Sequence, residues 1–264
     1  MNPPADQAHA FPARVYHPQK TSLARYLYIH PSIHMSNWKT DRERTSSLSD
    51  WTQVEEYSNS FLVRQDDAFN AIQHNDKNRG LPDIAVSANQ GKFLYLLAKT
   101  FGARRCLEVG TLGGFSTAWM ARAVPDDGKV VTFELNENYG KIARENWKIA
   151  GVSDKISLVL GSATETLVQY DPKERFDLAF IDADKEHCLL YFREAKRLVR
   201  KGGVIIVDNV VRYGKVADPS YQDHDTNGVR DLLKAIQSDD DVDATSLNTV
   251  GSKGLDGFLY ALLK

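Results

Sequence analysis

The chain has 264 residues, of which 42% are hydrophobic and 26% charged, as in ordinary soluble globular proteins. Lys and Arg number 33 against 35 for Asp and Glu, so the formal net charge is -2, which argues against a nucleic-acid-binding protein or a polybasic membrane anchor. Only two cysteines are present, Cys106 and Cys188, each inside an apolar run, which excludes a disulfide framework and a Cys-rich zinc site.

Residues 1–48 differ in composition from the rest of the chain. Five of the nine prolines and four of the seven histidines fall within the first 34 residues, which show little apolar periodicity. We therefore predict an N-terminal extension, partly disordered or wrapped over a neighbouring subunit. The spacing of its histidines is too irregular to indicate a metal site. Because the N-terminus lacks the pattern of a secretory signal and no apolar run reaches ~20 residues, we expect a cytoplasmic protein with no membrane partner.

Helix and strand patterns fill residues 49–264, which we predict to form one domain. Ser49 and Asp50 are typical of a helix start, and a second helix is expected over Ala88–Thr100. The buried side of this second helix is predicted to carry Phe93, Leu94, Leu96 and Leu97. Strands are then predicted over Arg105–Val109, Lys129–Glu134, Ile156–Leu160, Phe176–Ile181, Gly203–Val207, Thr245–Val250 and Gly257–Leu262. Helices are predicted between them over Phe115–Ala123, Glu137–Ala150, Ala163–Tyr170, His187–Arg200 and Asn227–Ile236.

Two of the predicted strands are almost purely apolar, at residues 178–181 and 204–207. Parallel strands that helices cover on both faces have this composition. The regular alternation of strand and helix therefore predicts an α/β fold with a Rossmann-like, doubly wound sheet. In such a sheet, ligands bind outside the carboxyl ends of the strands, so we expect the functional residues where each strand ends.

The first strand is followed by a glycine-rich turn, Gly110-Thr111-Leu112-Gly113-Gly114. Glycines let the backbone approach a ligand closely, but the turn is neither the G-x-G-x-x-G dinucleotide motif nor a P-loop. Glu108 beside the turn would repel a pyrophosphate and better suits a ligand with a cationic end. A tight strand-to-helix turn with an incidental acid is the alternative interpretation.

The second strand ends at Glu134. An acid at this position typically accepts hydrogen bonds from the two ribose hydroxyls of a nucleoside, although a solvated acid at a strand end is an equal alternative for this residue alone. Together with the glycine turn, Glu134 favours a nucleoside site without a phosphate group.

Polar residues also follow the fourth and fifth strands. Asp182 ends the fourth strand, and Asp208 and Asn209 end the fifth. Each alone fits a turn or a helix cap, but the three can converge at one sheet edge, and their hard oxygen donors favour Mg²⁺ over zinc or copper. Lys185 follows Asp182 by three residues, so it lies near the same point. Nearby positive charge favours the neutral form of a lysine, which could then act as a base.

With these motifs in place, the sequence resembles the cation-dependent class I O-methyltransferases that use S-adenosylmethionine, including caffeoyl-coenzyme A and catechol O-methyltransferases. The resemblance covers about Leu81 to the C-terminus. It rests on the stretch Glu108–Ser116, Glu134, the run Asp182–Lys185, the pair Asp208-Asn209 and the segment Val86–Leu94. Residues 214–226 are similar to the microbial branch. The resemblance implies a seven-stranded, mostly parallel sheet with an antiparallel C-terminal strand, and a homodimer.

The resemblance also implies roles for individual residues. Lys185 would be the general base. Ser116 would bind the carboxylate of S-adenosylmethionine, Glu134 its ribose, and Ala163 would lie near the adenine. The remaining cofactor contacts would come from Val86, Glu108, Gly110, Thr111 and Asp182. The divalent cation, Mg²⁺ with Ca²⁺ or Mn²⁺ as alternatives, would bind to Asp182, Asp208 and Asn209.

The sequence departs from the plant members after Asn209. Those members typically have an aromatic residue three positions on, where this chain has Arg212, followed by Tyr213. This departure disfavours a coenzyme A ester and favours a free catechol or another small phenol as substrate. A metal-independent methyltransferase, a nicotinamide enzyme and a non-catalytic methyltransferase-like binding protein remain as alternatives. The stretch Gly251–Gly257 differs from shorter microbial endings and receives no role at this stage.

Overall fold

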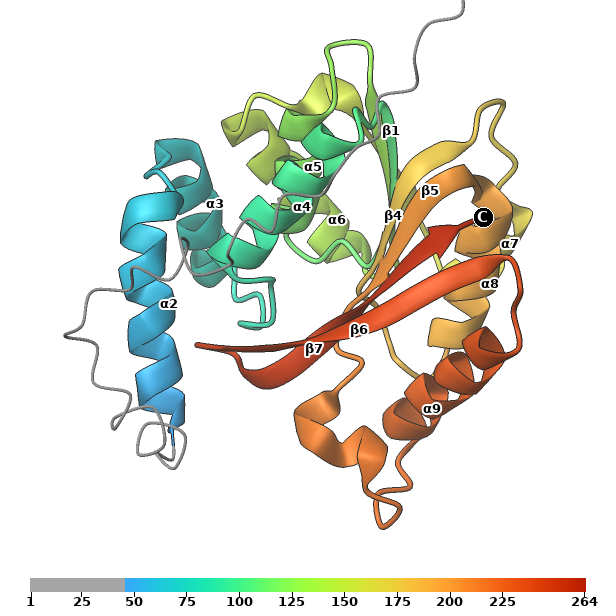
Figure 1. Ribbon diagram of the computed structural model, residues 1–264. Coiled ribbons are helices and arrows are strands. Elements are labelled where there is room, and N and C mark those ends of the chain that lie inside the picture. Colours follow the sequence, from blue (N-terminus) through green and yellow to red (C-terminus); the bar gives the residue numbers. More distant parts are fainter. Residues whose placement is uncertain (1–45) are drawn as a thin grey trace, which may run out of the picture. The chain divides into compact units, whose positions relative to one another are not determined.

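The computed structural model describes residues 46–264, so the predicted extension lies outside the described residues except at its C-terminal end. Its sheet has seven strands in the order β3-β2-β1-β4-β5-β7-β6 (Figure 1). The strands are β1 (Arg105–Val109), β2 (Lys129–Glu134), β3 (Ile156–Leu160), β4 (Phe176–Ile181), β5 (Val199–Val207), β6 (Val242–Gly251) and β7 (Gly254–Leu263). Strand β7 runs antiparallel to both of its neighbours, whereas all other pairs are parallel. The predicted seven-stranded, doubly wound sheet is confirmed.

Helices cover both faces of this sheet (Figure 1). They are α2 (Leu48–Leu62), α3 (Asp67–Asn78), α4 (Ala88–Thr100), α5 (Phe115–Ala123), α6 (Glu137–Ile149), α7 (Ala163–Gln169), α8 (Cys188–Leu198) and α9 (His224–Gln237). Alternate strand residues face opposite sides: Leu178 and Phe180 of β4 pack with α3–α6, whereas Ala179 and Ile181 pack with α7–α9. This double burial explains why the central strands are continuous apolar runs.

Several local predictions were wrong in detail: α3 was not predicted, and α9, β6 and β7 each begin three residues earlier than predicted. Three further differences have a local physical cause. Helix α2 begins at Leu48, because Ser47 and Asp50 form a capping box in which each side chain accepts from the other's backbone N–H. Leu96 of α4 is 51% exposed, since it lies on the opposite side of the helix from the buried Leu94. Strand β5 begins at Val199, earlier than its apolar run, because a bulge in its pairing with β4 accommodates the residues before Val204.

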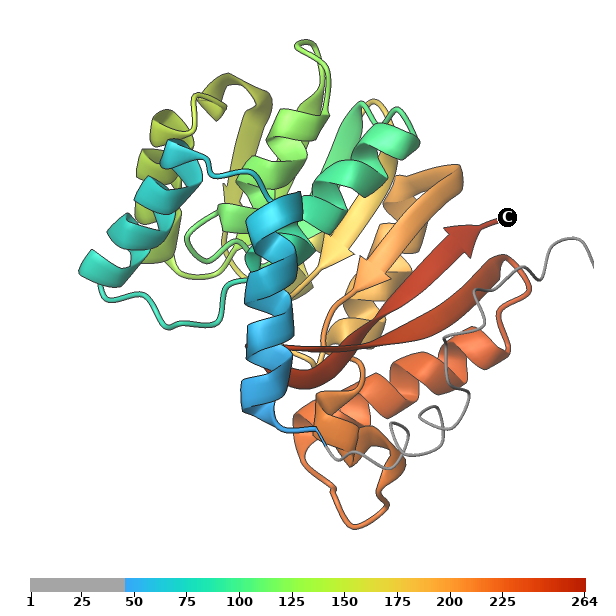
Figure 2. The same cartoon turned by 60° about the vertical axis from the view of Figure 1, so that its left-hand side comes forward.

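The β6–β7 hairpin extends beyond the core of the sheet toward α2, as both views of the fold show (Figure 2). Glu55 of α2 is buried there, and its Oε2 accepts a hydrogen bond from the backbone N–H of Ser252 at 2.6 Å. The hairpin tip is thereby fixed beside the carboxyl ends of the parallel strands.

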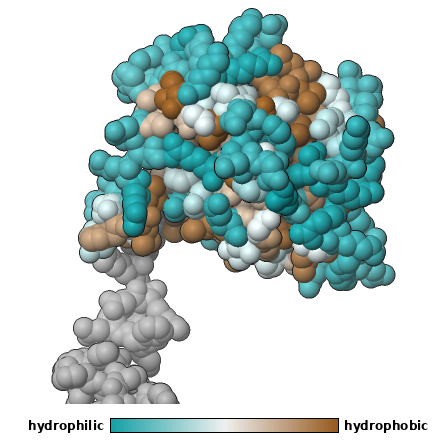
Figure 3. All heavy atoms as spheres, turned by 90° about the horizontal axis from the view of Figure 1, so that it is seen from above, coloured by the Kyte–Doolittle hydropathy of each residue, from teal (hydrophilic) through white to brown (hydrophobic). Residues whose placement is uncertain are grey.

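Seen from above, the surface is largely hydrophilic with interspersed apolar patches (Figure 3). Within residues 46–264, no helix has the length and apolar character that crossing a membrane requires.

Candidate functional site

The glycine-rich turn after β1 packs directly against the end of β4. Gly110 has φ +96°, and a Cβ at this position would lie 2.1 Å from the carbonyl oxygen of Asp182. Only glycine satisfies both the backbone conformation and the close approach. The turn ends at Gly114, whose carbonyl accepts a hydrogen bond from Trp147 Nε1 at 3.1 Å. The conformation of the turn is therefore dictated by its neighbours.

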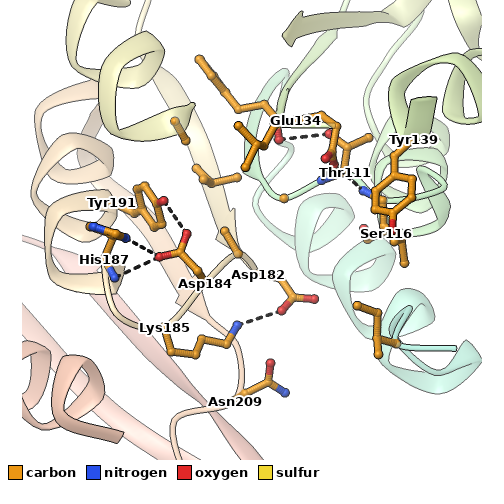
Figure 4. Close-up of a pocket in the computed structure, with 18 of the residues that line it drawn as sticks. Thr111, Ser116, Glu134, Tyr139, Asp182, Asp184, Lys185, His187, Tyr191 and Asn209 are labelled. Atoms are coloured by element: carbon orange, nitrogen blue, oxygen red, sulfur yellow. Dashed lines mark hydrogen bonds and ion pairs between the residues drawn. The ribbon is translucent and has the colours of Figure 1, made fainter. Parts of the chain in front are cut away.

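Glu134 joins this turn to the end of β2. Its Oε2 accepts a hydrogen bond from the backbone N–H of Thr111 at 3.1 Å (Figure 4). The same oxygen accepts from the N–H of Leu112 at 2.8 Å, and Oε1 accepts from that of Asn136 at 2.8 Å. The side chain is buried but lines the larger cavity described below. Glu134 thus holds the turn in place and presents negative charge to the cavity.

Glu108 lies beneath the turn and has no exposed surface. Its carboxylate accepts hydrogen bonds from the hydroxyls of Ser116 at 2.6 Å, Thr132 at 2.6 Å and Thr117. Burial raises the pKa of Glu108 to about 7, despite the opposing effect of these hydroxyls. Ser116 lines the cavity, so Glu108 is connected to the cavity wall through that hydroxyl.

The acidic residues after β4 and β5 lie at the same sheet edge, as predicted. Lys185 is buried, and its Nζ donates to Asp182 Oδ1 at 2.9 Å (Figure 4). Asp208 is also buried and accepts a hydrogen bond from Gln90 Nε2 at 2.7 Å. Its pKa is raised to about 7 by burial and by the negative charge of Asp182. The two carboxylates therefore interact strongly at this edge.

The repulsion between the carboxylates of Asp182 and Asp208 favours the binding of a cation between them. Within the described part of the chain, no group of three or more His, Cys, Asp or Glu side chains is placed to hold a metal ion. The predicted set contains two carboxylates and the amide of Asn209. Repulsion between Asp182 and Asp208 is relieved by a cation, and an incomplete set of oxygen donors fits an ion that keeps water or substrate ligands. The residues present therefore fit a hard divalent cation.

Two adjoining cavities open along these strand ends. The larger, of about 780 Å³, contains every predicted cofactor residue except the fully buried Glu108, namely Val86, Gly110, Thr111, Ser116, Glu134, Ala163 and Asp182. The smaller, of about 470 Å³, lies toward the β6–β7 hairpin and includes Gln90, Phe93, Asp208 and Phe258. Both cavities share Val86, Asp182, Asn209 and Arg212 in their walls. A ligand in one cavity would therefore lie next to a ligand in the other.

Several polar residues in these walls were not predicted from the sequence. In the larger cavity, Asp184 accepts from Tyr191 Oη at 2.6 Å and pairs with His187 Nδ1 at 2.5 Å (Figure 4). The spacing of these three residues by three and four positions places them together and could have revealed the cluster. In the smaller cavity, Gln90 approaches Asp208 from 118 positions earlier in the chain, and no local pattern signals that contact.

Comparison with known proteins gives consistent matches. Residues 60–257 match the family model described as O-methyltransferase. A catechol O-methyltransferase from Mycobacterium tuberculosis is 46% identical over 211 residues, which cover 80% of this chain and 95% of the relative. Another catechol O-methyltransferase, from Niastella koreensis, is 40% identical over 213 residues, covering 80% of this chain and 96% of the relative.

Solved structures show the same similarity. An O-methyltransferase from Bacillus cereus, in complex with SAH, has a TM-score of 0.81 and 42% identity, covering 83% of this chain and 100% of that chain. An O-methyltransferase from Streptomyces achromogenes, in complex with SAM, has a TM-score of 0.80 and 41% identity, covering 83% of this chain and 100% of that chain. These structural matches agree with the fold of the sheet and its helices.

Proposed function

Because the chain belongs to the O-methyltransferase family, we propose that it transfers the methyl group of S-adenosylmethionine to one hydroxyl of a catechol or another small phenol, with a divalent cation bound beside the acceptor. The observation that carries this proposal is the shared wall of the two cavities. Asp182 and Asn209 face both, with Lys185 directly beside Asp182. Donor and acceptor would meet across these residues.

The larger cavity suits the methyl donor. Its volume of about 780 Å³ lies within the range of small-molecule sites. Glu134 would accept hydrogen bonds from the ribose, and the hydroxyl of Ser116 would contact the amino-acid end. Val86, Gly110, Thr111 and Ala163 would form its walls. The charges of Glu134 and the buried Glu108 favour a ligand that carries a sulfonium and an ammonium group.

The smaller cavity suits a single phenolic ring. Phe93 and Phe258 lie in its wall, with ring centroids 5.1 Å apart, opposite the polar group at the strand ends. An aromatic ring can pack against such side chains while its hydroxyls face Asp182 and Asp208. Relatives at 46% and 40% identity are named catechol O-methyltransferases, which supports a vicinal diphenol as the acceptor.

Asp182, Asp208 and Asn209 would hold the cation. When bound, a divalent cation lowers the pKa of a hydroxyl that it coordinates and fixes the orientation of both oxygens. Lys185 lines the larger cavity, and its Nζ donates to Asp182, which lies in the wall shared by both cavities. In its neutral form, Lys185 Nζ would accept the proton of the acceptor hydroxyl. The deprotonated oxygen then bonds to the methyl carbon while the carbon–sulfur bond breaks, which leaves S-adenosylhomocysteine. Burial of Lys185 and Asp208 limits competition from water.

Mass spectrometry tests this proposal. The full-length protein is incubated with catechol, S-adenosylmethionine and Mg²⁺, and the products are examined for the gain of one methyl group. We expect monomethylated catechol, loss of turnover in excess EDTA and recovery after Mg²⁺ is added back. Full turnover in EDTA would eliminate the cation, and absence of methylated product over a broad panel of phenols would favour a non-catalytic binding protein.

We further infer a homodimer, which the surface of α2 supports. Val54, Tyr57, Phe61 and Leu62 are 65–72% exposed and form an apolar surface on a single helix. Light scattering of the full chain should give the mass of two copies, and Phe61→Glu should give the mass of one. Val168→Glu, a change at another exposed apolar residue, on α7, is the matched control. A wild-type mass of one copy would contradict the inference.

A further inference from the structure

The turn after β5 has the most strained backbone in the described part of the chain. In the described residues 46–264, four non-glycine residues have positive φ. Three of them lie in the turn after β5: Asn209 at 56°, Arg212 at 54° and Tyr213 at 57°. Asparagine tolerates this conformation better than other residues with a Cβ, but arginine and tyrosine rarely adopt it. Such backbone strain persists only where surrounding contacts hold it, so the turn needs an external support.

Asp256, the third residue of β7, supplies that support. Its Oδ1 accepts hydrogen bonds from the backbone N–H groups of Val211 at 3.2 Å and Arg212 at 2.9 Å, and from that of its own neighbour Gly257 at 2.9 Å. The carbonyl of Gly257 accepts from the N–H of Val210 at 2.9 Å. Two adjacent residues of β7 thus bind three consecutive backbone N–H groups of the turn.

The hairpin tip adds contacts farther along the same turn. Tyr213 Oη donates to the carbonyl oxygen of Lys253 at 3.0 Å. A Cβ on Gly254 would lie 2.7 Å from the Tyr213 ring, so the ring packs directly against the glycine backbone. On the other side, Arg212 pairs with Asp225 at 2.8 Å. The segment Gly251–Gly257, to which the sequence analysis gave no role, therefore packs along the turn.

The turn carries residues that matter to both cavities. Asn209 and Arg212 are in the shared wall, and Asp256 itself borders the smaller cavity. A displacement of the turn would shift Asn209 and Arg212 relative to Asp182, which the separate strand β4 holds. In the proposed function, the relation between these groups would decide which acceptor oxygen lies next to Lys185.

We propose that Asp256 is a positioning residue that, through the turn 209–213, determines which of two neighbouring hydroxyls is methylated. This inference rests on the proposed function. The carboxylate suits this role because one of its oxygens accepts hydrogen bonds from three N–H groups. A charged oxygen accepts such bonds more strongly than a neutral one. Asp256→Ala leaves the N–H groups of Val211 and Arg212 without this acceptor, whereas Asp256→Asn keeps a carbonyl oxygen there.

The first measurement is amide hydrogen exchange, which does not depend on activity. In Asp256→Ala, we expect the peptide covering residues 208–214 to exchange at least about tenfold faster, with β1 and β4 unchanged. Asp256→Asn should show a smaller increase. Asp243→Asn, at an exposed acid on the neighbouring strand β6, is the matched control and should match wild type. Unchanged exchange at 208–214 in both Asp256 variants would overturn the proposal.

The second measurement is the ratio of the two monomethylated isomers formed from 3,4-dihydroxybenzoate. This ratio does not depend on how much enzyme is folded, so a merely structural role would leave it unchanged. We expect Asp256→Asn to change the ratio by at least about twofold and to lower the acceptor kcat/KM by about tenfold, with the affinity for S-adenosylmethionine unchanged.

The outcomes separate the two hypotheses. A wild-type protein that methylates no phenol refutes the proposed function, and the exchange measurement then still decides whether Asp256 holds the turn. A wild-type protein that forms both isomers, together with Asp256 variants that keep the wild-type ratio, refutes the positioning role alone. If Asp256→Ala does not fold, Asp256→Asn carries both measurements.

Discussion

The turn after β1 and the turn after β5 border the same larger cavity, but the side chains that hold them differ in burial. The first is bound by buried side chains of the core: Asn146 Nδ2 donates to the carbonyl of Gly113 at 2.8 Å, Trp147 to that of Gly114, and Glu134 accepts from its backbone. The second depends on Asp256, a partly buried residue of the β6–β7 hairpin.

This difference in support separates a turn whose position must stay constant from a turn whose position can change. A site for one methyl donor benefits from a turn fixed by the core, because any displacement weakens every contact at once. A site that selects among acceptors can be altered through a hairpin without disturbing the core. We infer that the first turn acts as a rigid support for the donor and that the second adjusts the acceptor.

The largest effect on activity is expected at Lys185, beside Asp182 in the wall that the two cavities share. Lys185→Ala should lower kcat by about 10²- to 10⁴-fold, because Nζ is the group proposed to take the acceptor proton. The dissociation constant for S-adenosylmethionine, measured by calorimetry, should change little. Lys234→Ala, at an exposed lysine of α9, is the control. An unchanged kcat would remove Lys185 as the base, and a loss of donor affinity alone would place it on the donor side.

A smaller effect is expected at Glu134, which tests the rigid support. Glu134→Gln places an amide N–H₂ where the carboxylate now faces the N–H groups of Thr111, Leu112 and Asn136. We expect the dissociation constant for S-adenosylmethionine to rise by about tenfold to a hundredfold, with the acceptor KM unchanged at saturating donor. Glu137→Gln, in the exposed first turn of α6, is the control. An equal weakening of S-adenosylmethionine binding and of the acceptor KM would show that the two turns are not independent.

The sequence predicted the positions of these supports unevenly. The strands β1, β2, β3 and β4 were predicted with their observed bounds, because glycines and acids end each apolar run abruptly. Since parallel strands bring their carboxyl ends to one edge, Glu134, Asp182 and Asp208 could be placed together from spacing alone. The donor side of the site was therefore largely predictable.

The support of the second turn was not predictable. Asp256 lies 44 and 45 positions from the N–H groups that it binds, and the contact requires β7 to insert between β5 and β6. Helix α3 was missing from the prediction, since Phe69 and Ile72 are its only buried residues and the rest of its sequence is polar. Contacts of this kind depend on tertiary packing, which local patterns do not encode.

A still smaller effect is expected from a support that does not touch the cavity. Asn146→Ala removes hydrogen bonds to Gly113 and to Asp76, whose Oδ1 lies 2.6 Å from Asn146 Nδ2. We expect the free energy of unfolding to fall by about 1–3 kcal/mol and donor affinity to fall by about threefold to tenfold. Urea unfolding and calorimetry check both values, with Asn138→Ala as the control at a helix surface. Unchanged donor affinity would show that the glycine turn keeps its shape without α6.

The smallest effect concerns how stability varies with pH on the donor side. The pKa of Glu108 is raised by burial to about 7, from an ordinary value of 4.5. Between these values the folded protein binds more protons than the unfolded chain, so the stability that Glu108 contributes is complete below about pH 4.5 and is lost as the pH rises through about 7. The pKa of Asp208 is raised as well. Because Asp208 is present both in wild type and in a Glu108 variant, its effect cancels when the two are compared.

Glu108→Gln isolates this contribution. We expect wild type to lose more stability than the variant between pH 5 and pH 8, by on the order of 1–3 kcal/mol in urea unfolding without added ligand. Glu137→Gln, at an exposed acid, should follow wild type. Parallel pH profiles for wild type and Glu108→Gln would mean that the hydroxyls of Ser116, Thr117 and Thr132 already offset the cost of burying the charge. The donor side would then be stabilised at neutral pH by its own hydrogen bonds, and would not depend on a cationic ligand to balance Glu108.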